Sequence, residues 1–155
     1  MFQNTDDVRI DQLRPLIPPA ILMEELPLSP EMTRTVASSR KAVAECLNGD
    51  SDKLVVVVGP CSIHDTKAAL EYGDLLREAM ATHGNELVIL MRVYFEKPRT
   101  TVGWKGMIND PGLDNSFNIN LGLRTARKLL SELTAKGVPT GTEFLDTITP
   151  QFIAD

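Results

Sequence analysis

Apolar residues are arranged in two different ways along the chain, and the change comes near Lys53. Before Pro27 they are scattered and interrupted by prolines, which predicts an extended arm that lies on another surface. After Lys53, short continuous apolar runs alternate with stretches whose apolar residues recur at helical spacing. We therefore expect an amino-terminal extension over residues 1–50, followed by strand-helix units over residues 51–155.

A helix is predicted within the extension, between Ser29 and Gly49. The Ser29 hydroxyl can accept a hydrogen bond at the start of this helix, Pro30 suits its first position, and Gly49 suits its end. The apolar residues expected near one face of the helix are Val36, Ala37, Ala44 and Leu47.

Three strand-helix units are predicted in the second part. Continuous apolar runs predict a strand at 54–58, covered on both faces, and a second at 87–91. A third strand is expected from Val138 to Phe144. Helices are expected from Asp65 to Gly84, over residues 121–133 with an end near Gly137, and from Thr149 onwards.

Alternating strands and helices predict right-handed crossovers and a parallel sheet, either doubly wound or part of a (β/α) barrel. In both architectures, chemistry takes place beyond the carboxyl ends of the strands. The segments in that position are Gly59–Asp65, Arg92–Lys105 and Glu143–Asp146. A doubly wound nucleotide-binding domain is disfavoured, because the first strand leads into Gly59-Pro60-Cys61 and not into a glycine-rich phosphate loop.

The segment Arg92–Lys105, called the basic loop below, belongs to a long connection, and connections of that length are usually functional or disordered. Arginine offers a planar fork for carboxylate or phosphate, and lysine offers a compact charge. We interpret the loop as the holder of anionic, phosphorylated substrates. The alternative, a solvated charged loop, is disfavoured by the shaped Gly103-Trp104-Lys105-Gly106 segment. The residues that carry the interpretation are Arg92, Lys97, Arg99 and Lys105 as cations, Pro98 as a stiffener, and Thr100 and Thr101 as hydroxyl donors.

Four further side chains have more than one interpretation. Cys61 is either a small buried apolar residue or a thiolate that serves as metal ligand or nucleophile. Glu143 either orients a water, moves a proton, neutralises the basic loop or forms an ion pair with it. His64 is expected to have a structural or supporting role and not to act as a base, and Trp104 to anchor its loop and not to stack on substrate.

Composition narrows the class of protein. The chain has 155 residues, 43% of them hydrophobic, which is enough for one sizeable core. A net charge of −5 argues against a general nucleic-acid or anionic-membrane surface. No apolar run approaches the roughly 18 residues of a membrane span, and residues 1–7 lack signal-peptide features, so a cytoplasmic location is expected. Cys46 and Cys61 sit in unlike contexts, which argues against a disulfide.

Two long motifs give the chain a close resemblance to a known family. Gly59-Pro60-Cys61-Ser62-Ile63-His64-Asp65 and the run from Met91 to Gly106 resemble the class I 3-deoxy-D-arabino-heptulosonate 7-phosphate (DAHP) synthases. The resemblance continues through Ile108–Pro111, Asp114–Phe117, Ala126–Leu130 and Glu143–Asp146, and it covers essentially the whole chain.

The resemblance implies a fold and a reaction. The fold would be α/β, a (β/α)8 TIM barrel, of which this chain carries the amino-terminal extension and about three βα units. The reaction would condense phosphoenolpyruvate with erythrose 4-phosphate, the first step of the shikimate pathway to aromatic amino acids. Arg92 and Lys97 would hold phosphoenolpyruvate, whereas Pro98, Arg99 and Thr100 would line the erythrose 4-phosphate site.

The resemblance also implies a divalent metal ion, with manganese, iron, cobalt and zinc all open. Cys61 would be a ligand of this metal, which would polarise the aldehyde oxygen as a Lewis acid. Lys97 and Glu143 would be the catalytic residues, with Glu143 positioning the water that adds to phosphoenolpyruvate.

Regulation and assembly follow from the same resemblance. The extension would make contacts between subunits of a homo-oligomer, and an aromatic amino acid would act as feedback effector near Asp146, Pro150 and Gln151. Thr147 stands where phenylalanine-sensitive members tend to carry methionine, so the identity of the effector stays open.

A complete barrel needs about 250 residues, and this chain supplies only part of one. We therefore expect a truncated barrel whose isolated form lacks turnover, because the later strands that carry the family's other metal ligands are missing. The alternative function is a catalytically inactive fragment that acts as an assembly partner of full-length subunits.

Overall fold

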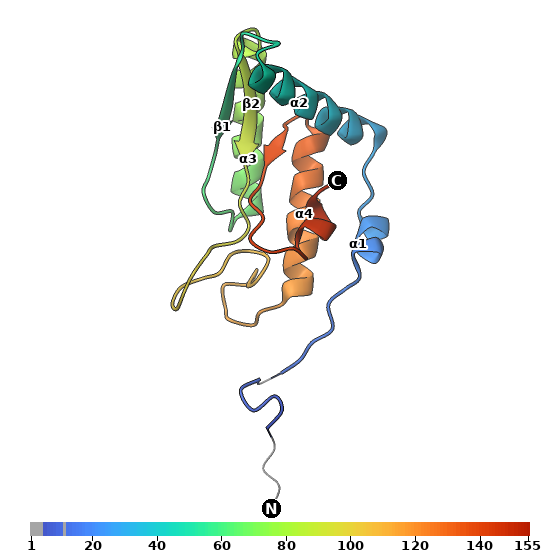
Figure 1. The fold of residues 1–155 in the computed structure, drawn as a ribbon, viewed down its shortest axis with the longest axis vertical. Helices are drawn as coiled ribbons and strands as arrows, with labels where there is room; N and C mark the ends of the chain where they lie inside the picture. The colour runs from blue at the N-terminus through green and yellow to red at the C-terminus, as the bar shows by residue number, and fades with distance from the viewer. Residues whose placement is uncertain (1–4, 11) are drawn as a thin grey trace, which may run out of the picture.

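A computed structural model describes residues 5–10 and 12–155, and its elements follow the predicted strand-helix order (Figure 1). Three parallel strands form one sheet, in the order β1 (Leu54–Val58), β2 (Leu87–Arg92) and β3 (Thr140–Gly141). The α/β class and the parallel sheet are thus confirmed. The helices are α1 (Pro19–Glu25), α2 (Pro30–Asn48), α3 (Thr66–His83), α4 (Ile119–Ala135) and α5 (Pro150–Ile153).

The order of the strands in the sheet follows the order of the chain. β1 pairs with β2 from Leu54 and Leu87 onwards, and β2 pairs with β3 where Arg92 meets Gly141. Each crossover therefore adds its strand to the same edge, as in a (β/α) barrel and also in one half of a doubly wound sheet. The arrangement brings the carboxyl ends of all three strands together.

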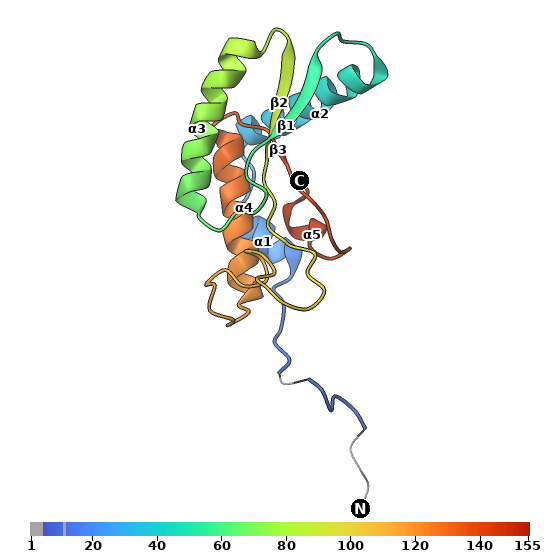
Figure 2. The ribbon, with the colours of Figure 1, turned by 90° about the vertical axis from the view of Figure 1, so that its left-hand side faces the viewer.

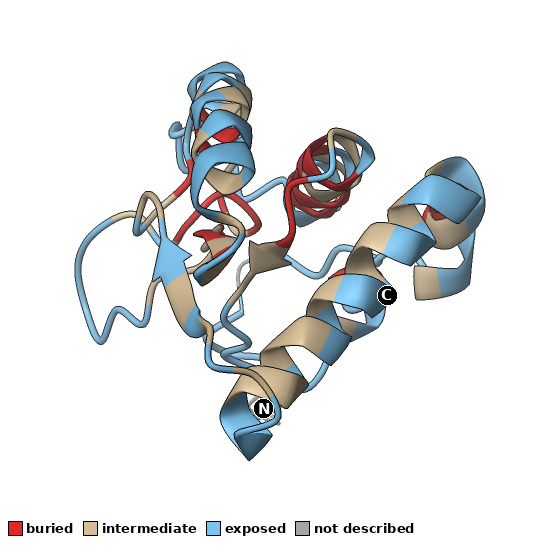
Figure 3. Ribbon diagram, turned by 90° about the horizontal axis from the view of Figure 1, so that it is seen from above, coloured by how far each residue is buried: buried red, intermediate tan, exposed pale blue. Residues whose placement is uncertain are grey.

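The core lies between the sheet and the helices α3 and α4. Ile89 and Met91 of β2 point into it, and they are 6% and 0% exposed. Gly73 allows the two helices to approach closely, because a Cβ atom there would lie 2.5 Å from Cδ2 of Leu133. Figure 3 shows buried residues concentrated in α4 and where α3 faces it, with α2 on the other side of the sheet. Leu90, which alternates with Ile89 and Met91, faces α2 across a cavity that Val36 and Val43 also line.

Local signals fixed most helix boundaries as predicted. Ser29 Oγ accepts a hydrogen bond from Met32 N (3.3 Å), and Gly49 ends α2 in a left-handed conformation with φ 78°. Asp65 Oδ1 accepts from the backbone N–H groups of Lys67 and Ala68 at the start of α3. These caps use only neighbouring residues, which is why the sequence predicted them.

The amino-terminal arm differs from the prediction, because α1 forms within the segment expected to be extended. Pro18 and Pro19 occupy the start of α1, where a helix loses nothing from a missing N–H. Leu22, fully buried, fixes the helix on the body of the molecule. Before α1 the described residues run away from the body (Figure 2), and Ile17 N donates to Asn120 Oδ1 where the arm leaves it.

The third strand is shorter than the predicted span from Val138 to Phe144. The backbone N–H of Val138 donates back to Leu133 O at the end of α4 (3.0 Å), so this residue is not free to join the sheet. After Gly141, whose carbonyl accepts from Val93 N (2.9 Å), Glu143 and Phe144 are exposed and lie outside the strand. The prediction was wrong because Val138 belongs to the end of α4, just past Gly137 with φ 78°, and because residue types alone do not show which backbone groups find partners.

Of two predictions about covered faces, one was wrong and the other is confirmed only in part. The first strand was expected to be covered on both faces, but Leu54 and Val57 are 68% and 54% exposed, because β1 lies at the edge of the sheet. In α2 the predicted face holds only in part. Val36 is half-buried, whereas Leu47 is 76% exposed, and Ala37 and Ala44 are exposed as well.

Within the part of the chain that the structure describes, no helix is both long enough and apolar enough to cross a membrane. The predicted lack of a signal peptide concerns residues 1–7, of which 1–4 lie outside the described residues.

Candidate functional site

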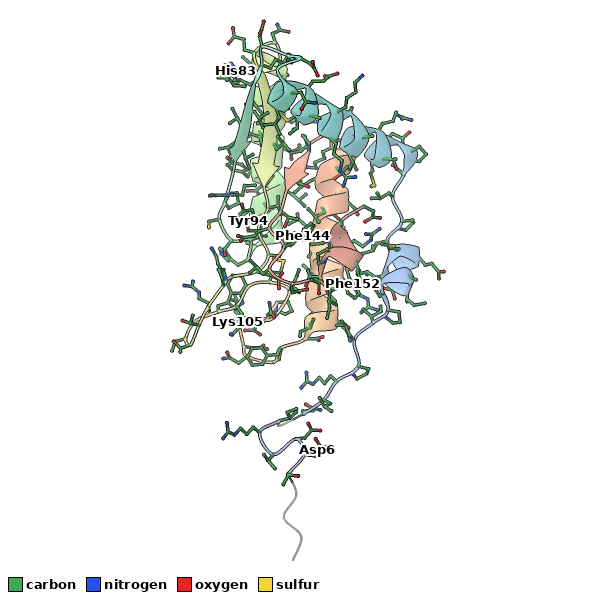
Figure 4. The ribbon with its side chains drawn as sticks, in the orientation of Figure 1. Asp6, His83, Tyr94, Lys105, Phe144 and Phe152 are labelled. Atoms are coloured by element: carbon green, nitrogen blue, oxygen red, sulfur yellow. The ribbon has the colours of Figure 1, made fainter. Side chains whose placement is uncertain are left out.

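Three of the predicted site residues meet where the strands end. Cys61 follows β1, Arg92 is the last residue of β2, and Glu143 follows β3. The order of the strands brings these positions to one edge of the sheet, as the sequence predicted. In Figure 4, Tyr94 and Phe144 mark this level, and Lys105 lies in the basic loop beyond it.

Arg92 is held in place by the end of β1. Its guanidinium donates to Gly59 O through Nε (3.1 Å) and Nη2 (2.8 Å), and its Cζ lies 5.7 Å from the centre of the Tyr94 ring. Gly59 has φ 145°, and a Cβ atom there would lie 2.8 Å from Arg92 O. Only glycine therefore allows this close approach, which orients a cation before any ligand arrives.

Lys97 and Cys61 form the closest contact between the two segments. Lys97 Nζ donates to Cys61 Sγ at 3.0 Å. This hydrogen bond is the main cause that lowers the pKa of the Cys61 thiol, and the charges of Lys97 and Arg92 lower it further. Burial and the charge of Glu143 oppose the effect. Cys61 is exposed, so the interpretation as a buried apolar residue is wrong, and the lowered pKa of its thiol favours the alternative of a metal ligand or nucleophile.

The basic loop turns back on itself. Lys97 N donates to Lys105 O (2.9 Å), and Lys105 Nζ contacts Arg99 O at 3.5 Å. Trp104 is an anchor, as expected, because its Nε1 donates to Asp110 O (2.7 Å). The remaining predicted residues of the loop lie between Lys97 and Lys105 and are exposed: Pro98, Arg99, Thr100 and Thr101.

Glu143 stands near the cluster without pairing with it. Its charge acts on Cys61 and on Glu96, but among residues 5–10 and 12–155 it forms no ion pair. The interpretation of Glu143 as the ion-pair partner of the basic loop is therefore wrong. Its carboxylate is exposed at the edge of the site and available to a water or a substrate.

Glu96 is the residue that sequence reasoning missed. It was counted only as a negative charge within the basic loop, yet it is half-buried and its Oε2 has no hydrogen-bond partner among the described residues. Burial is the main cause that raises the pKa of this carboxyl, with Asp146 and Glu143 adding to the effect and Asn109 opposing it. Little in the sequence indicated this burial, because Glu96 alternates with apolar Val93 and Phe95 in the way that a solvent-facing residue would.

Of the predicted effector residues, Asp146 and Thr147 lie in the turn before α5, and Pro150 and Gln151 begin that helix. Asp146 Oδ1 accepts from Ile148 N (2.6 Å) and Thr149 N (2.7 Å), and Oδ2 accepts from Thr149 Oγ1 (2.7 Å). The hydrogen bond from the backbone of Thr149 is the main cause that lowers the pKa of Asp146. Thr147 O accepts from Gln151 Nε2 (3.4 Å), and Pro150 begins α5. Asp146 therefore shapes this turn.

Metal binding finds partial support in these residues. Among the described residues, no three His, Cys, Asp or Glu side chains gather in a group that could hold a metal ion. Cys61 is a suitable single donor, since its thiol has a lowered pKa. A stable site needs three or four protein ligands, so Cys61 would have to share a metal with donors from another segment. His64 is exposed and lines two pockets beside Asp65, one of which also includes Gly59 and Pro60.

Comparisons with known proteins agree with the resemblance. A sequence model of the DAHP synthetase I family matches residues 27–155. The phospho-2-dehydro-3-deoxyheptonate aldolase of Amycolatopsis methanolica is 56% identical over 153 residues, which are 99% of this chain and 75% of that protein. The Phe-sensitive aldolase of Escherichia coli K12 is 55% identical over 154 residues, 99% of this chain and 44% of that protein.

A solved structure is also similar to this chain. The phospho-2-dehydro-3-deoxyheptonate aldolase of Francisella tularensis superimposes with a TM-score of 0.90 at 55% sequence identity. The match covers 94% of this chain and 42% of that one. The chain thus spans less than half the length of the Escherichia and Francisella proteins.

Proposed function

This chain belongs to the DAHP synthetase I family, and from that premise we propose that it carries the anion-holding part of a DAHP synthase active site. The reaction joins C3 of phosphoenolpyruvate to the aldehyde carbon of erythrose 4-phosphate, water adds at C2, and inorganic phosphate leaves. The observation that carries the proposal is the contact of Lys97 with Cys61 beside the fixed guanidinium of Arg92.

Arg92 and Lys97 are proposed to bind phosphoenolpyruvate. Two of the Arg92 donors are used on Gly59 O, which fixes the plane of the guanidinium, and the cation as a whole attracts the carboxylate and phosphate groups. Lys97 supplies a compact charge at the same edge. Because both side chains are positioned beforehand, less conformational entropy is lost on binding.

The outer part of the basic loop is proposed to bind erythrose 4-phosphate. Arg99 and Thr100 are exposed there, and Pro98 limits the backbone between them and Lys97. Lys105 closes the loop from the other side through its contacts with Lys97 and Arg99. Lys97 thus lies between the two substrate positions, as a residue that acts on the reacting groups must.

Glu143 is proposed to orient the water that adds to phosphoenolpyruvate. Its carboxylate is exposed and unpaired within the described residues, and it lies close enough to the Cys61 thiol to affect its pKa. An ionised carboxylate in this position can accept a proton from the incoming water. Cys61 is proposed as one ligand of a divalent metal, which when bound would supply Lewis-acid polarisation of the aldehyde.

Fold, assembly and regulation are proposed on the same premise. The three strands would be the first three of a (β/α)8 barrel over residues 51–155, and residues 1–50 would contact other subunits of a homo-oligomer. The relative from Escherichia coli is named Phe-sensitive. For this chain we propose an aromatic amino-acid effector near Asp146, Thr147, Pro150 and Gln151, a turn that lies on the surface.

Binding of phosphoenolpyruvate to the purified chain, measured by titration calorimetry, tests the proposal. Arg92→Ala and Lys97→Ala are each expected to weaken binding at least tenfold, because each removes a charge-assisted contact. Lys128→Ala, an exposed lysine on α4, is the matched control and is expected to leave binding unchanged. Equal binding by all four proteins, or none by the unaltered chain, would overturn the assignment of this site.

A further inference from the structure

The side chains of Glu96 and Asn109 contact each other next to Lys97, and Asn109 also contacts the backbone that bonds to Lys97. Asn109 Nδ2 contacts Glu96 Oε1 (3.3 Å) and also Lys105 O (3.4 Å). That same carbonyl of Lys105 accepts the hydrogen bond from Lys97 N (2.9 Å). The Asn109 amide therefore bridges the residue before Lys97 and the residue that holds the Lys97 backbone.

We propose that Glu96 and Asn109 form a clamp that positions Lys97 for anion binding. Neither residue needs to touch substrate, so both are positioning residues. The role given to Lys97 rests on the proposed function, whereas the clamp itself rests on the contacts described above.

The surrounding backbone shows that the clamp has little room to adjust. Gly106 has φ 108°, and a Cβ atom there would lie 2.1 Å from Phe95 O and 2.6 Å from Glu96 Cα. Ile108 N also donates to Phe95 O (3.4 Å). The two sides of the basic loop are thus pressed together at Glu96, and a shift of this residue would move Lys97 with it.

The surroundings of Glu96 favour its neutral form. Its Oε2 is buried without a partner among the described residues, and no basic side chain of the basic loop forms an ion pair with it there. The ionisable groups that act on it from the segment after β3 are Glu143 and Asp146, and both are acidic. When the Glu96 carboxyl is neutral, its Oε1 can still accept the hydrogen bond from Asn109. The neutral form also avoids placing a third negative charge near Glu143 and Asp146.

Four variants test whether the hydrogen bonds of Glu96 and Asn109 position Lys97, or whether any side chain of similar size at these positions would do so. Glu96→Gln keeps a neutral side chain of the same shape, and Glu96→Ala removes it. Asn109→Ala removes the bridging amide, and Asn109→Asp replaces it with a carboxylate beside the acidic group. Asn85→Asp, in the exposed turn before β2, is the control for the added charge alone.

The first measurement is hydrogen exchange of the Lys97 backbone amide by NMR, which needs no ligand. Asn109→Ala, Asn109→Asp and Glu96→Ala are expected to speed exchange about tenfold, whereas Glu96→Gln and Asn85→Asp stay within about twofold. Thermal melts of each variant confirm that the protein is folded. Unchanged exchange in folded Asn109 and Glu96→Ala variants would overturn the clamp, as would equal damage from Glu96→Gln and Glu96→Ala.

The second measurement is phosphoenolpyruvate affinity against pH. As the pH rises and Glu96 ionises, the affinity of the unaltered chain for phosphoenolpyruvate is expected to fall relative to that of Glu96→Gln. Titration of phosphoenolpyruvate itself affects both proteins equally. Parallel profiles for the two proteins would contradict the positioning role. If the unaltered chain binds no phosphoenolpyruvate at any pH, the proposed function fails, and amide exchange alone then decides whether the clamp exists.

Discussion

Arg127 offers the strongest test of how this fold is held together. Its side chain is 3% exposed, and its guanidinium donates to Leu26 O and Phe152 O, both at 2.9 Å. It also binds both carboxylate oxygens of Asp155, at 2.5 and 2.8 Å. One side chain on α4 thus joins the segment after α1, the helix α5 and Asp155.

Replacing Arg127 with methionine keeps an apolar stem of similar length but removes every one of these donors. Two backbone carbonyls and the exposed carboxylate of Asp155 would lose their partner, and breaking a fully buried ion pair from one side costs about 3–5 kcal/mol. Asp155 is partly exposed and can regain water, so we expect a loss at the lower end, about 3 kcal/mol. For a chain of this size that corresponds to a fall in Tm of roughly 6–12 °C.

Thermal unfolding followed by circular dichroism measures this loss, with Lys128→Met as the matched control. Lys128 is the next residue on α4, its side chain is 66% exposed, and its ion pair with Glu132 is a surface contact worth little. The control is therefore expected to change Tm by less than about 2 °C. A fall for Arg127→Met no larger than that of the control would refute the reasoning.

Three further predictions concern the basic loop and Gly106, the residue that follows it. Lys97→Met should raise the pKa of Cys61 towards its ordinary value and therefore slow alkylation of Cys61 by iodoacetamide at neutral pH. Alkylation of half-buried Cys46, measured in the same digest, should be unchanged. Equal rates of Cys61 alkylation in the variant and the unaltered chain would contradict the contact. Gly106→Ala should lower the free energy of unfolding in urea by about 2 kcal/mol or more, because the positive φ and the contact with Phe95 O both oppose a side chain. A decrease in the free energy of unfolding below about 0.5 kcal/mol would count against that crowding. Glu96 holds its proton in the folded chain at pH values where the unfolded chain has released it, so stability should fall as pH rises from about 4.5 through the raised pKa. Glu96→Gln should remove that fall, and a persistent slope would show that another group causes it.

Apart from α1, the helices were predictable because their signals are local. Ser29, Asp65 and Gly49 act within one turn of their own positions, so a short stretch of sequence contains the whole interaction. The candidate site was predictable for a related reason. Once alternating strands and helices imply a parallel sheet, residues that follow the strands must meet at one edge, whatever the details of packing.

The errors came where distant residues decide the outcome. The short β3 is an exception, because Val138 bonds back to nearby Leu133 just past the left-handed Gly137, which is a local interaction. β1, by contrast, is exposed because of its place at the edge of the sheet. The importance of Arg127 was equally hidden, since its partners Leu26 and Asp155 are far away in sequence. No local pattern reports which carbonyl or carboxylate a buried guanidinium will find.

The sequence by itself determined the order of the elements, their caps, the basic loop and the family, because these depend on residue type and short-range spacing. Only the tertiary structure decided that Lys97 contacts Cys61, that Glu143 stays unpaired and that Glu96 is half-buried beside Asn109. The physical reason is that burial and charge act through space. A carboxyl group has its pKa raised by the atoms folded around it, and those atoms come from segments that the chain order keeps apart.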